Sequence, residues 1–489
     1  MMHKIYLLSL HLLLLLLLCF NPLTTVADDN STTGGIDGWC DQTPYPDPCK
    51  CYFKNHNGFL LPTQLSEFRI MLVEATMDRA ISARDELAQS SRNCTDCRKQ
   101  AVLADCIDLY GDTIVQLTRT LEGVSPKAGT GEGCTDFDAQ TWLSTALTNT
   151  ETCRRGSSDL NVSDFITPIV SNTKISNLIS NCLAVNGALL PTGNNGTTTA
   201  DGKGFPTWVS SKERRLLQLQ SARAVRANLV VAKHGSGHVN TVQAAVDVAG
   251  RRKVTSGRYR GTSLHSQRPN IPEHGWSRER PGRALRSSSD LSIFYKCSIE
   301  GYQDTLMVHS QRQFYRGCYI YGTVDFIFGN EAVVFQNCLI LPRRPLKGQA
   351  NVITAQGRAD PFQNTGISIH NSRIQPAPDL KPVVRTVKTY MGRPWMKYSR
   401  TVVLKTHLDS AVSPLGWSPW TEGSVFGLDT LFYAEYKNTG PGSSTKWRVR
   451  WKGFHVLNRD SDASAFIVGR FIAGTVWLPH TGVPFTSGL

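Results

Sequence analysis

The sequence has little that could hold it in a membrane. Residues 5–20 form one apolar run behind Lys4, interrupted only by Ser9 and His11, and no later stretch of the 489 residues is apolar enough to span a bilayer. The run is shorter than a typical membrane span, and small residues at positions 25–27 follow it as a cleavage site. We therefore expect residues 1–27 to be a signal peptide and the mature chain to be secreted, extracellular and free of a membrane anchor. Four N-x-[ST] sequons, which agree with the secretory route, begin at Asn30, Asn93, Asn161 and Asn195.

The sequence also lacks a residue pattern typical of a zinc site. It holds 13 cysteines, of which Cys94 and Cys97 form a C-x-x-C pair, but a second pair at zinc-site spacing is missing. We interpret this pair as structural or incidental and expect no metal. Cys19 leaves with the signal peptide, and the remaining cysteines can form disulfides outside the cytosol.

Acidic side chains are in the minority. There are 39 Asp and Glu residues against 53 Lys and Arg residues, which gives a net charge of +14. A basic protein outside the cell usually meets a polyanion. Nucleic acid is one option, but the extracellular location argues against it, and an acidic polysaccharide fits better. Charge alone does not choose between the two.

Helical periodicity dominates the first part of the mature chain, residues 40–185. Between residues 103 and 121, apolar side chains recur at intervals of three and four residues, as one face of an amphipathic helix requires. Three further segments show similar faces. Four amphipathic helices with short connections predict an all-α four-helix bundle, to which we assign residues 28–190.

A polar, glycine-rich segment separates this bundle from the rest. Residues 193–199 read GNNGTTT, and the dibasic pair Arg214 and Arg215 follows. We assign residues 191–217 to a linker, and a dibasic site in an exposed linker of a secreted protein is a natural place for proteolysis. A solvated charge cluster without processing is the alternative.

After the linker, helical periodicity gives way to a repeat rich in β-branched and aromatic residues. Residues 294–299 (FYKCSI) are echoed by residues 314–320 (FYRGCYI), and Cys297 and Cys318 lie 21 positions apart. Short strands at this period predict an all-β, right-handed parallel β-helix over residues 218–489, with each coil stacked on the last. A column of cysteine and asparagine residues would then form an inward-facing ladder. The chain is therefore predicted to be multidomain.

The repeat brings two carboxylates together. Asp304 and Asp325 each lie seven residues beyond the cysteine of their own coil. Equivalent residues of adjacent coils are roughly 5 Å apart, so the two aspartates should lie side by side. Two carboxylates this close do not both ionise readily, so one is pushed towards the protonated form while the other stays charged. The protonated group can act as a general acid, and the charged one as a nucleophile.

Two further side chains would complete this site. Arg393 is expected to hold Asp325 ionised and oriented, because the segment around Asp325 is otherwise apolar. Gln303 offers an amide donor that suits a developing oxyanion. No Ser–His arrangement in the sequence competes for the role. Stacked polar ladders also occur in β-helices without catalysis, so the pairing alone leaves both interpretations open.

Several motifs of the C-terminal region resemble those of plant pectin methylesterases (pectinesterases). The match is dense over residues 284–489, also covers residues 227–253, and rests on GYQDTL, RQFY, GTVDFIFGN, ITAQGR, YMGRPW and the final FTSGL. These motifs are highly specific. The resemblance implies that the chain hydrolyses galacturonate methyl esters of pectin in the cell wall, without a cofactor.

The helical region resembles the pectin methylesterase inhibitor family, here as an N-terminal pro-region. The match is carried by YPxxC at residues 45–49 and by TWLS at residues 141–144. This resemblance implies two disulfides, Cys40–Cys49 and Cys106–Cys153. Residues 214–217 look like the family's processing site, where cleavage would release the catalytic domain from an inhibitor-like region that can contact it.

The resemblance to pectin methylesterases also implies a role for each residue of the site. Asp325 is similar to the nucleophile that attacks the ester carbonyl, and Asp304 to the acid that helps methanol leave and then activates water. Gln303 matches an oxyanion-stabilising glutamine, and Arg393 matches the arginine that holds the nucleophile. Two aromatic residues are implied to line the substrate groove, Trp395 and Trp417. Packing in the core is the alternative for both.

Residues 254–283 depart from the family pattern. The stretch is rich in arginine, poor in apolar residues and without strand alternation, and the chain is short by about two coils here. Pro281 stands where the family has a second oxyanion glutamine, and Met307 where it usually has tyrosine. Either coding sequence has been lost and an out-of-frame patch remains, or the protein lacks these coils. The second case removes an oxyanion donor, which stabilises the transition state by about 2.7–4 kcal/mol.

Two other functions stay open. A catalytically impaired homologue would act through its N-terminal bundle as a methylesterase inhibitor. A different β-helix enzyme, such as a pectate lyase or a polygalacturonase, would need a calcium-binding acid cluster or another carboxylate set, and neither is found in the sequence.

Overall fold

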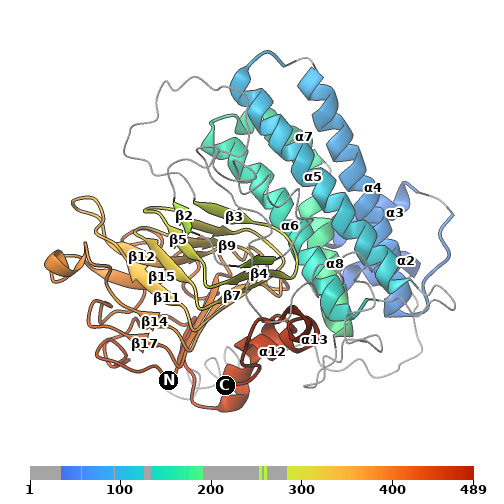
Figure 1. Ribbon diagram of the computed structural model, residues 1–489. Coiled ribbons are helices and arrows are strands. Elements are labelled where there is room, and N and C mark those ends of the chain that lie inside the picture. Colours follow the sequence, from blue (N-terminus) through green and yellow to red (C-terminus); the bar gives the residue numbers. More distant parts are fainter. Residues whose placement is uncertain are drawn as a thin grey trace, which may run out of the picture.

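The computed structural model describes residues 35–56, 58–92, 94–125, 134–172, 174–190 and 284–489, together with two short strands at residues 253–255 and 258–260. The predicted signal peptide, the linker with Arg214 and Arg215, and Pro281 lie outside the described residues. Figure 1 shows two parts side by side, an elongated helical bundle and a stack of β-strands. No helix in the described part of the chain is long and apolar enough to cross a membrane.

The helical part is built around four helices, α4 (Leu65–Arg92), α5 (Cys97–Val124), α6 (Asp136–Asp159) and α8 (Ile175–Leu189). Three shorter helices accompany them, α2 (Gly35–Asp41), α3 (Pro46–Lys54) and α7 (Ser163–Asn172). The apolar face predicted within residues 103–121 points into the bundle, since Leu103, Tyr110 and Leu117 are fully buried. The predicted four-helix bundle is therefore confirmed.

Two disulfides fix the bundle. Cys40–Cys49 joins α2 to α3, and Cys106–Cys153 joins α5 to α6. Both are the pairs that the family resemblance implies. The second bridge closes a sequence separation of 47 residues, which in the chain-entropy picture stabilises the fold by about 4 kcal/mol.

The second part consists of three parallel sheets. Sheet I contains β1 (Lys253–Thr255), β4 (Ser292–Tyr295), β7 (Arg312–Arg316), β10 (Ala332–Gln336), β13 (Gly366–His370), β16 (Arg400–Leu404), β18 (Phe432–Tyr436) and β19 (Phe454–Val456). Sheet II contains β2 (Arg258–Arg260), β5 (Ser298–Glu300), β8 (Tyr319–Gly322), β11 (Leu339–Pro342), β14 (Arg373–Ile374) and β17 (His407–Leu408). Sheet III contains β3 (Leu285–Ser287), β6 (Leu306–Val308), β9 (Ile327–Gly329), β12 (Asn351–Gln356) and β15 (Thr389–Pro394). From β4 to β15, each coil passes from sheet I through sheet II to sheet III, which confirms the predicted parallel β-helix.

The strand register follows the sequence repeat. Phe294 pairs with Tyr315 in sheet I, and Ser298 pairs with Tyr319 in sheet II, so both pairings are offset by 21 residues. Inside the coils, the rings of Phe294, Tyr315 and Phe335 stack with centroids 4.6 and 4.7 Å apart. The repeat therefore sets both the register and an aromatic column in the core.

The expected inward ladder of cysteines and asparagines is only half correct. Cys297 and Cys318 are fully buried, but Asn337 and Asn371 are exposed. Both asparagines adopt a left-handed backbone, with φ of 53° and 48°, at the corner between sheets I and II. Because asparagine tolerates this conformation better than most residues, it takes the turn position next to the cysteine and faces solvent.

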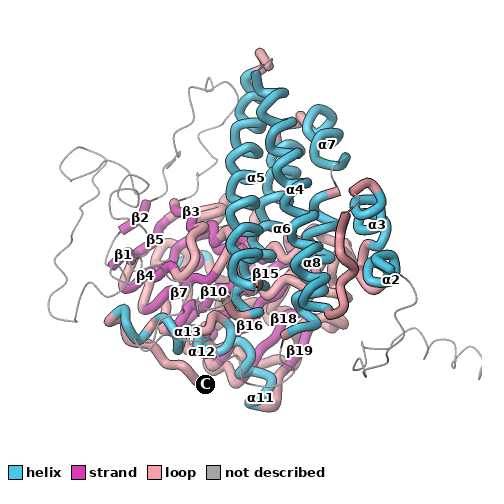
Figure 2. Tube along the Cα trace, turned by 90° about the vertical axis from the view of Figure 1, so that its right-hand side faces the viewer, coloured by secondary structure: helices cyan, strands magenta, loops and turns pink. Residues whose placement is uncertain are grey.

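Short helices near the C-terminus cover the outer face of sheet I. They are α11 (Asp460–Ala463), α12 (Val468–Phe471) and α13 (Gly474–Trp477). Val468, Phe471 and Trp477 pack in one apolar cluster with outward-facing residues of sheet I, such as Ile293 and Phe314. Figure 2 shows these helices below the long bundle. Sheet I is therefore buried on both faces.

The helical bundle docks on the β-helix through α6 and α8. In Figures 1 and 2, α6 runs alongside the stacked strands. Side chains of α6 contact four places on the β-helix, at residues 309–312, 330, 362–364 and 395–396. Ser180 on α8 donates to Asp360.

Candidate active site

Asp304 and Asp325 lie at the corner between sheets II and III, in adjacent coils. The strands before them pair Glu300 with Tyr321, and the strands after them pair Leu306 with Ile327. The backbone N–H of Asp304 also donates to the carbonyl of Val324 at 3.0 Å. The two aspartates therefore stack one above the other, as the 21-residue register predicts.

Both aspartates have a left-handed backbone, with φ of 56° for Asp304 and 50° for Asp325. Aspartate, like asparagine, adopts this conformation more readily than most residues, and the same left-handed backbone occurs at the corner residues Asn337 and Asn371. The turn projects the two carboxylates from the edge where sheet II ends and sheet III begins. The same local feature thus recurs in two adjacent coils.

Arg393 binds Asp325 in a bidentate manner. Its Nε donates to Oδ1 of Asp325 at 2.9 Å, and its Nη2 donates to Oδ2 at 2.6 Å. The Asp325 side chain is only 8% exposed, so burial raises its pKa above the ordinary value, and the two hydrogen bonds from Arg393 partly offset this rise. The expected orienting contact is therefore present, and it acts on a carboxyl that burial makes more basic.

Asp304 and Gln303 are the more accessible members of the site. Asp304 is half-buried, and Gln303, which precedes it, is exposed at the same turn. An exposed amide beside two stacked carboxylates is free to approach a substrate carbonyl from solvent. The turn therefore brings together both residues that the sequence predicts here.

The structure corrects one aromatic assignment. Trp417 is 0% exposed and packs inside the β-helix with its ring 4.4 Å from that of Tyr433, so it does not line a surface groove. Trp420, three residues later, is half-buried, and the Arg393 guanidinium lies 4.4 Å from its ring centre. The carbonyl of Trp420 also accepts a hydrogen bond from Nη1 of Arg393 at 2.9 Å.

Sequence reasoning missed Trp420 because the family resemblance pointed to Trp395 and Trp417 alone. In the structure, Trp417 follows Gly416, which has a φ of 71°, and Trp417 forms a β-bridge with Gly392. Trp420 follows Pro419 in a segment without strand pairing, where a side chain is more often at the surface.

Trp395 lies at the site, but the helical bundle covers it. It is half-buried and packs with Met307, Phe328 and Ala355 in a small cluster. The guanidinium of Arg155, from α6, lies 4.8 Å from its ring centre and contacts the sulfur of Met396. Burial lowers the pKa of this arginine below its ordinary value. The ring of Trp395 is therefore shared between the site and the bundle.

A set of polar contacts fixes α6 against the β-helix. Thr152 on α6 hydrogen bonds with His309 at 2.9 Å, and the side-chain amide of Asn330 donates to Thr148 at 2.9 Å. A cavity of only about 20 Å³ remains between the two surfaces, next to Trp395. Because α6 leaves so little space here, a polymer chain has no access to this side of Trp395 in the docked arrangement.

The described residues offer no metal centre. They contain no group of three or more His, Cys, Asp and Glu side chains arranged to hold an ion. The chemistry available at the corner is therefore that of two stacked carboxylates, one guanidinium and one amide, a set suited to acyl transfer through a carboxylate nucleophile.

Comparisons with known proteins identify the family. The chain matches the family model described as pectinesterase over residues 274–475, and the model of the plant invertase/pectin methylesterase inhibitor over residues 35–185. It is 72% identical to the probable pectinesterase/pectinesterase inhibitor 59 of Arabidopsis thaliana, across 100% of this chain and 99% of that protein. It is 44% identical to pectinesterase 2 of Citrus sinensis, across 93% and 95% of the two chains. A solved pectin methylesterase from carrot is 41% identical and covers 55% of this chain and 100% of its own, with a TM-score of 0.48.

The alignment with the first Arabidopsis protein runs over 543 positions, 54 more than the 489 residues of this chain. At 21 residues per coil, 54 positions equal between two and three coils. The absence of about two coils at residues 254–283 stays a prediction from the sequence.

Proposed function

Because this chain belongs to the pectinesterases that carry an N-terminal inhibitor-like domain, we propose that Asp304, Asp325 and Arg393 perform its chemistry. The enzyme hydrolyses galacturonate methyl esters of pectin and releases methanol, and thereby modifies the plant cell wall. The observation that supports this assignment best is the bidentate Asp325–Arg393 pair beside the stacked Asp304. We place its action outside the cell, as the predicted signal peptide indicates.

In the first half of the reaction, a carboxylate oxygen of Asp325 attacks the carbonyl carbon of the ester. The tetrahedral intermediate carries an oxyanion, to which the amide of Gln303 can donate a hydrogen bond. Its collapse breaks the bond to the methoxy oxygen, and Asp304 gives that oxygen a proton, so that methanol leaves. The product is an anhydride between Asp325 and the galacturonate unit.

In the second half, Asp304 is a carboxylate and takes a proton from water. The resulting hydroxide attacks the galacturonyl carbon of the anhydride, and the bond to Asp325 breaks. Asp325 leaves as a carboxylate, Asp304 is protonated again, and the product is a free galacturonic acid unit. The stacked arrangement is required here, since one aspartate must reach the methoxy oxygen while the other is bonded to carbon.

Arg393 holds the carboxylate of Asp325 in a fixed orientation. Two parallel hydrogen bonds fix both oxygens of Asp325, and the ring of Trp420 lies against the guanidinium. Orientation of this kind avoids a reorganisation cost at the moment of attack. A lysine could supply the charge but not the bidentate geometry.

We also infer that the helical bundle restrains the enzyme within the uncut chain. Arg155 covers the ring of Trp395, which we assign to the substrate groove. Cleavage at Arg214 and Arg215 would release the bundle and open this side of the groove. The test is to replace the dibasic pair by a site for a specific protease and to measure methanol release before and after cutting. An increase is expected, and an unchanged rate would rule out the restraint.

The catalytic assignment is tested by methanol release from highly methylated pectin, with the cut enzyme and its Asp325→Ala variant. We expect the variant to lose activity by several orders of magnitude while it keeps its fold by circular dichroism. Asp409→Ala, at a half-buried aspartate beyond β17, is the matched control and should retain activity. Methanol release that survives Asp325→Ala would remove the nucleophile assignment. A wild-type chain without activity that still inhibits another methylesterase would instead support the inhibitor function.

A further inference from the structure

A groove runs along another corner of the β-helix, between sheets I and II. Its volume is about 600 Å³, and it extends over five successive coils, from the turn at Gly317 to Thr439. With coils about 4.8 Å apart, this corresponds to a length of roughly 20 Å. The groove is thus in the size range of ligand-binding clefts and is elongated along the axis of the β-helix.

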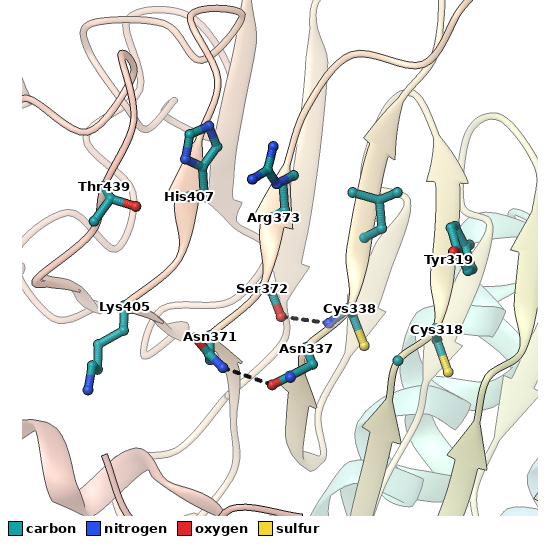
Figure 3. A pocket seen from close by; sticks show the side chains of 12 residues that line it. Cys318, Tyr319, Asn337, Cys338, Asn371, Ser372, Arg373, Lys405, His407 and Thr439 are labelled. Carbon is teal, nitrogen blue, oxygen red and sulfur yellow. Dashed lines mark hydrogen bonds between the residues drawn. The ribbon is translucent and has the colours of Figure 1, made fainter.

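Two outward-facing columns form its walls (Figure 3). One column follows the left-handed turn positions, where Asn337, Asn371 and Lys405 stack in successive coils. The side-chain amide of Asn371 donates to that of Asn337 at 3.0 Å, which fixes the two relative to each other. The other column follows the first residues of the sheet II strands, where Arg373 pairs with His407. The register of the coils therefore spaces the wall residues regularly.

The groove carries positive charge. Arg373 and Lys405 are exposed, and within the described residues neither forms an ion pair. His407 is half-buried and lies beside Arg373 in the next coil. Burial lowers the pKa of the neighbouring His370 to about 4, and the positive charges of Lys405 and Arg316 lower this pKa further. The groove is therefore suited to an anionic ligand.

The opposite end of the groove offers a different kind of contact. Tyr319 is 48% exposed and stands in the strand column one coil before Leu339. An exposed tyrosine ring packs well on the apolar face of a sugar, and its hydroxyl can remain in water. Between this ring and the cations lie the two asparagine amides, which can bind hydroxyl groups. Aromatic, amide and cationic contacts thus follow one another along one line.

We propose that this groove is a second, non-catalytic binding site for a linear polyuronate, an acidic polysaccharide with a carboxylate on each sugar unit. A single linear chain fits an elongated groove with regularly spaced donors better than a duplex or a globular partner does. The bound segment would be de-esterified, because an esterified unit lacks the charge that Arg373 and Lys405 attract. The site therefore recognises the kind of chain that the proposed reaction leaves behind.

This groove is separate from the carboxylate site. Asp304 and Asp325 occupy the corner between sheets II and III, whereas the groove occupies the corner between sheets I and II. A polymer held in the groove leaves the catalytic corner open. The enzyme could then remain attached to a de-esterified stretch while it acts on an esterified one.

Binding can be tested without catalysis. The probe is a de-esterified oligogalacturonate, titrated into the full chain at low and at moderate salt, with Arg373→Ala/Lys405→Ala as the variant. Two exposed ion pairs contribute little each, so we expect an affinity loss of about three- to tenfold at low salt. Methanol release from a short esterified oligomer should be unchanged, because neither residue belongs to the catalytic corner. The binding result is independent of the proposed function, since it does not require turnover.

The control variant is Arg470→Ala/Lys54→Ala, which removes the same charge from exposed residues elsewhere. An equal loss of affinity in both double variants would show that net charge alone binds the probe and would overturn the site. Tyr319→Ala should weaken binding further, and Tyr319→Phe should not. A sulfated polysaccharide or single-stranded DNA bound as tightly as the oligogalacturonate, with no effect of Tyr319→Ala, would overturn the polyuronate assignment.

Discussion

Arg312 on β7 and Asp138 on α6 form an ion pair of 2.6 Å in which each side chain is only 1% exposed. Arg312 also binds Asp290 through two hydrogen bonds of 2.9 and 2.6 Å. Asp138 is at the same time part of the capping box with Thr135 that begins α6. The start of α6 is therefore tied to the β-helix by a buried arginine between two carboxylates, one from each part of the chain.

Asp138→Asn should loosen the docking of the bundle on the β-helix. Removal of one partner leaves a buried guanidinium with a single carboxylate, which costs about 3 kcal/mol. We expect α6 to lose protection in hydrogen exchange and the uncut chain to release more methanol. Asp136→Asn is the control, because Asp136 pairs with Arg69 inside the bundle. Equal behaviour of the two variants would mean that the Arg312–Asp138 pair does not hold the parts together.

Arg393→Lys should change both the rate and its pH dependence. Asp325 must be deprotonated to attack, and burial already raises its pKa while Arg393 limits the rise. Without the two guanidinium hydrogen bonds the pKa should increase further, so the acidic limb of kcat/KM moves to higher pH. Loss of orientation should also lower kcat by about a hundredfold. The measurement is methanol release as a function of pH, and an acidic limb that stays in place or moves to lower pH would contradict this role.

Much of the fold and of the carboxylate pair could be predicted from the sequence because both depend on a local repeat. The 21-residue offset between Cys297 and Cys318 sets the register, and the register alone stacks Asp304 on Asp325. The outward direction of Asn337 was missed, because a left-handed turn at one position reverses the side on which a residue faces. The Arg312–Asp138 contact could not be predicted from the sequence either, because no periodicity relates residues that are 174 positions apart and belong to different domains.

Substitution of the two neighbouring tryptophans should separate packing from catalysis. Trp417→Ala removes a fully buried ring and should destabilise the fold by about 3–5 kcal/mol, seen as a lower Tm. Trp420→Ala should leave Tm nearly unchanged and lower kcat, because the ring against the Arg393 guanidinium is lost. Trp417→Phe provides a folded comparison. Loss of activity in Trp417→Phe together with normal activity in Trp420→Ala would restore the assignment made from the sequence.

Glu331 should be a source of instability at neutral pH. It is fully buried between β9 and β10, and neither carboxylate oxygen has a hydrogen-bond partner among the described residues. Burial raises its pKa well above the ordinary value, and a contact of the carboxylate with its own backbone N–H, which is too poorly aligned to count as a hydrogen bond, offsets only part of this rise. A carboxyl with a higher pKa in the folded than in the unfolded state stabilises the fold fully below the unfolded pKa, and this contribution is lost as pH rises through the folded pKa.

Glu331→Gln removes the charge at nearly constant volume, so it should increase the free energy of unfolding at pH 7 by about 1–3 kcal/mol and flatten its decline with pH. The measurement is the thermal unfolding of the cut enzyme between pH 4 and pH 8, a range set by the ordinary carboxyl pKa of about 4.3. Glu435→Gln is the matched control, because Glu435 is equally buried but forms two hydrogen bonds with Arg448 of 2.6 and 3.1 Å. That variant should be less stable than the wild type at neutral pH. If Glu331→Gln were destabilising in the same way, a partner for the Glu331 carboxylate would have to exist in the folded protein, and the predicted pH dependence would disappear with it.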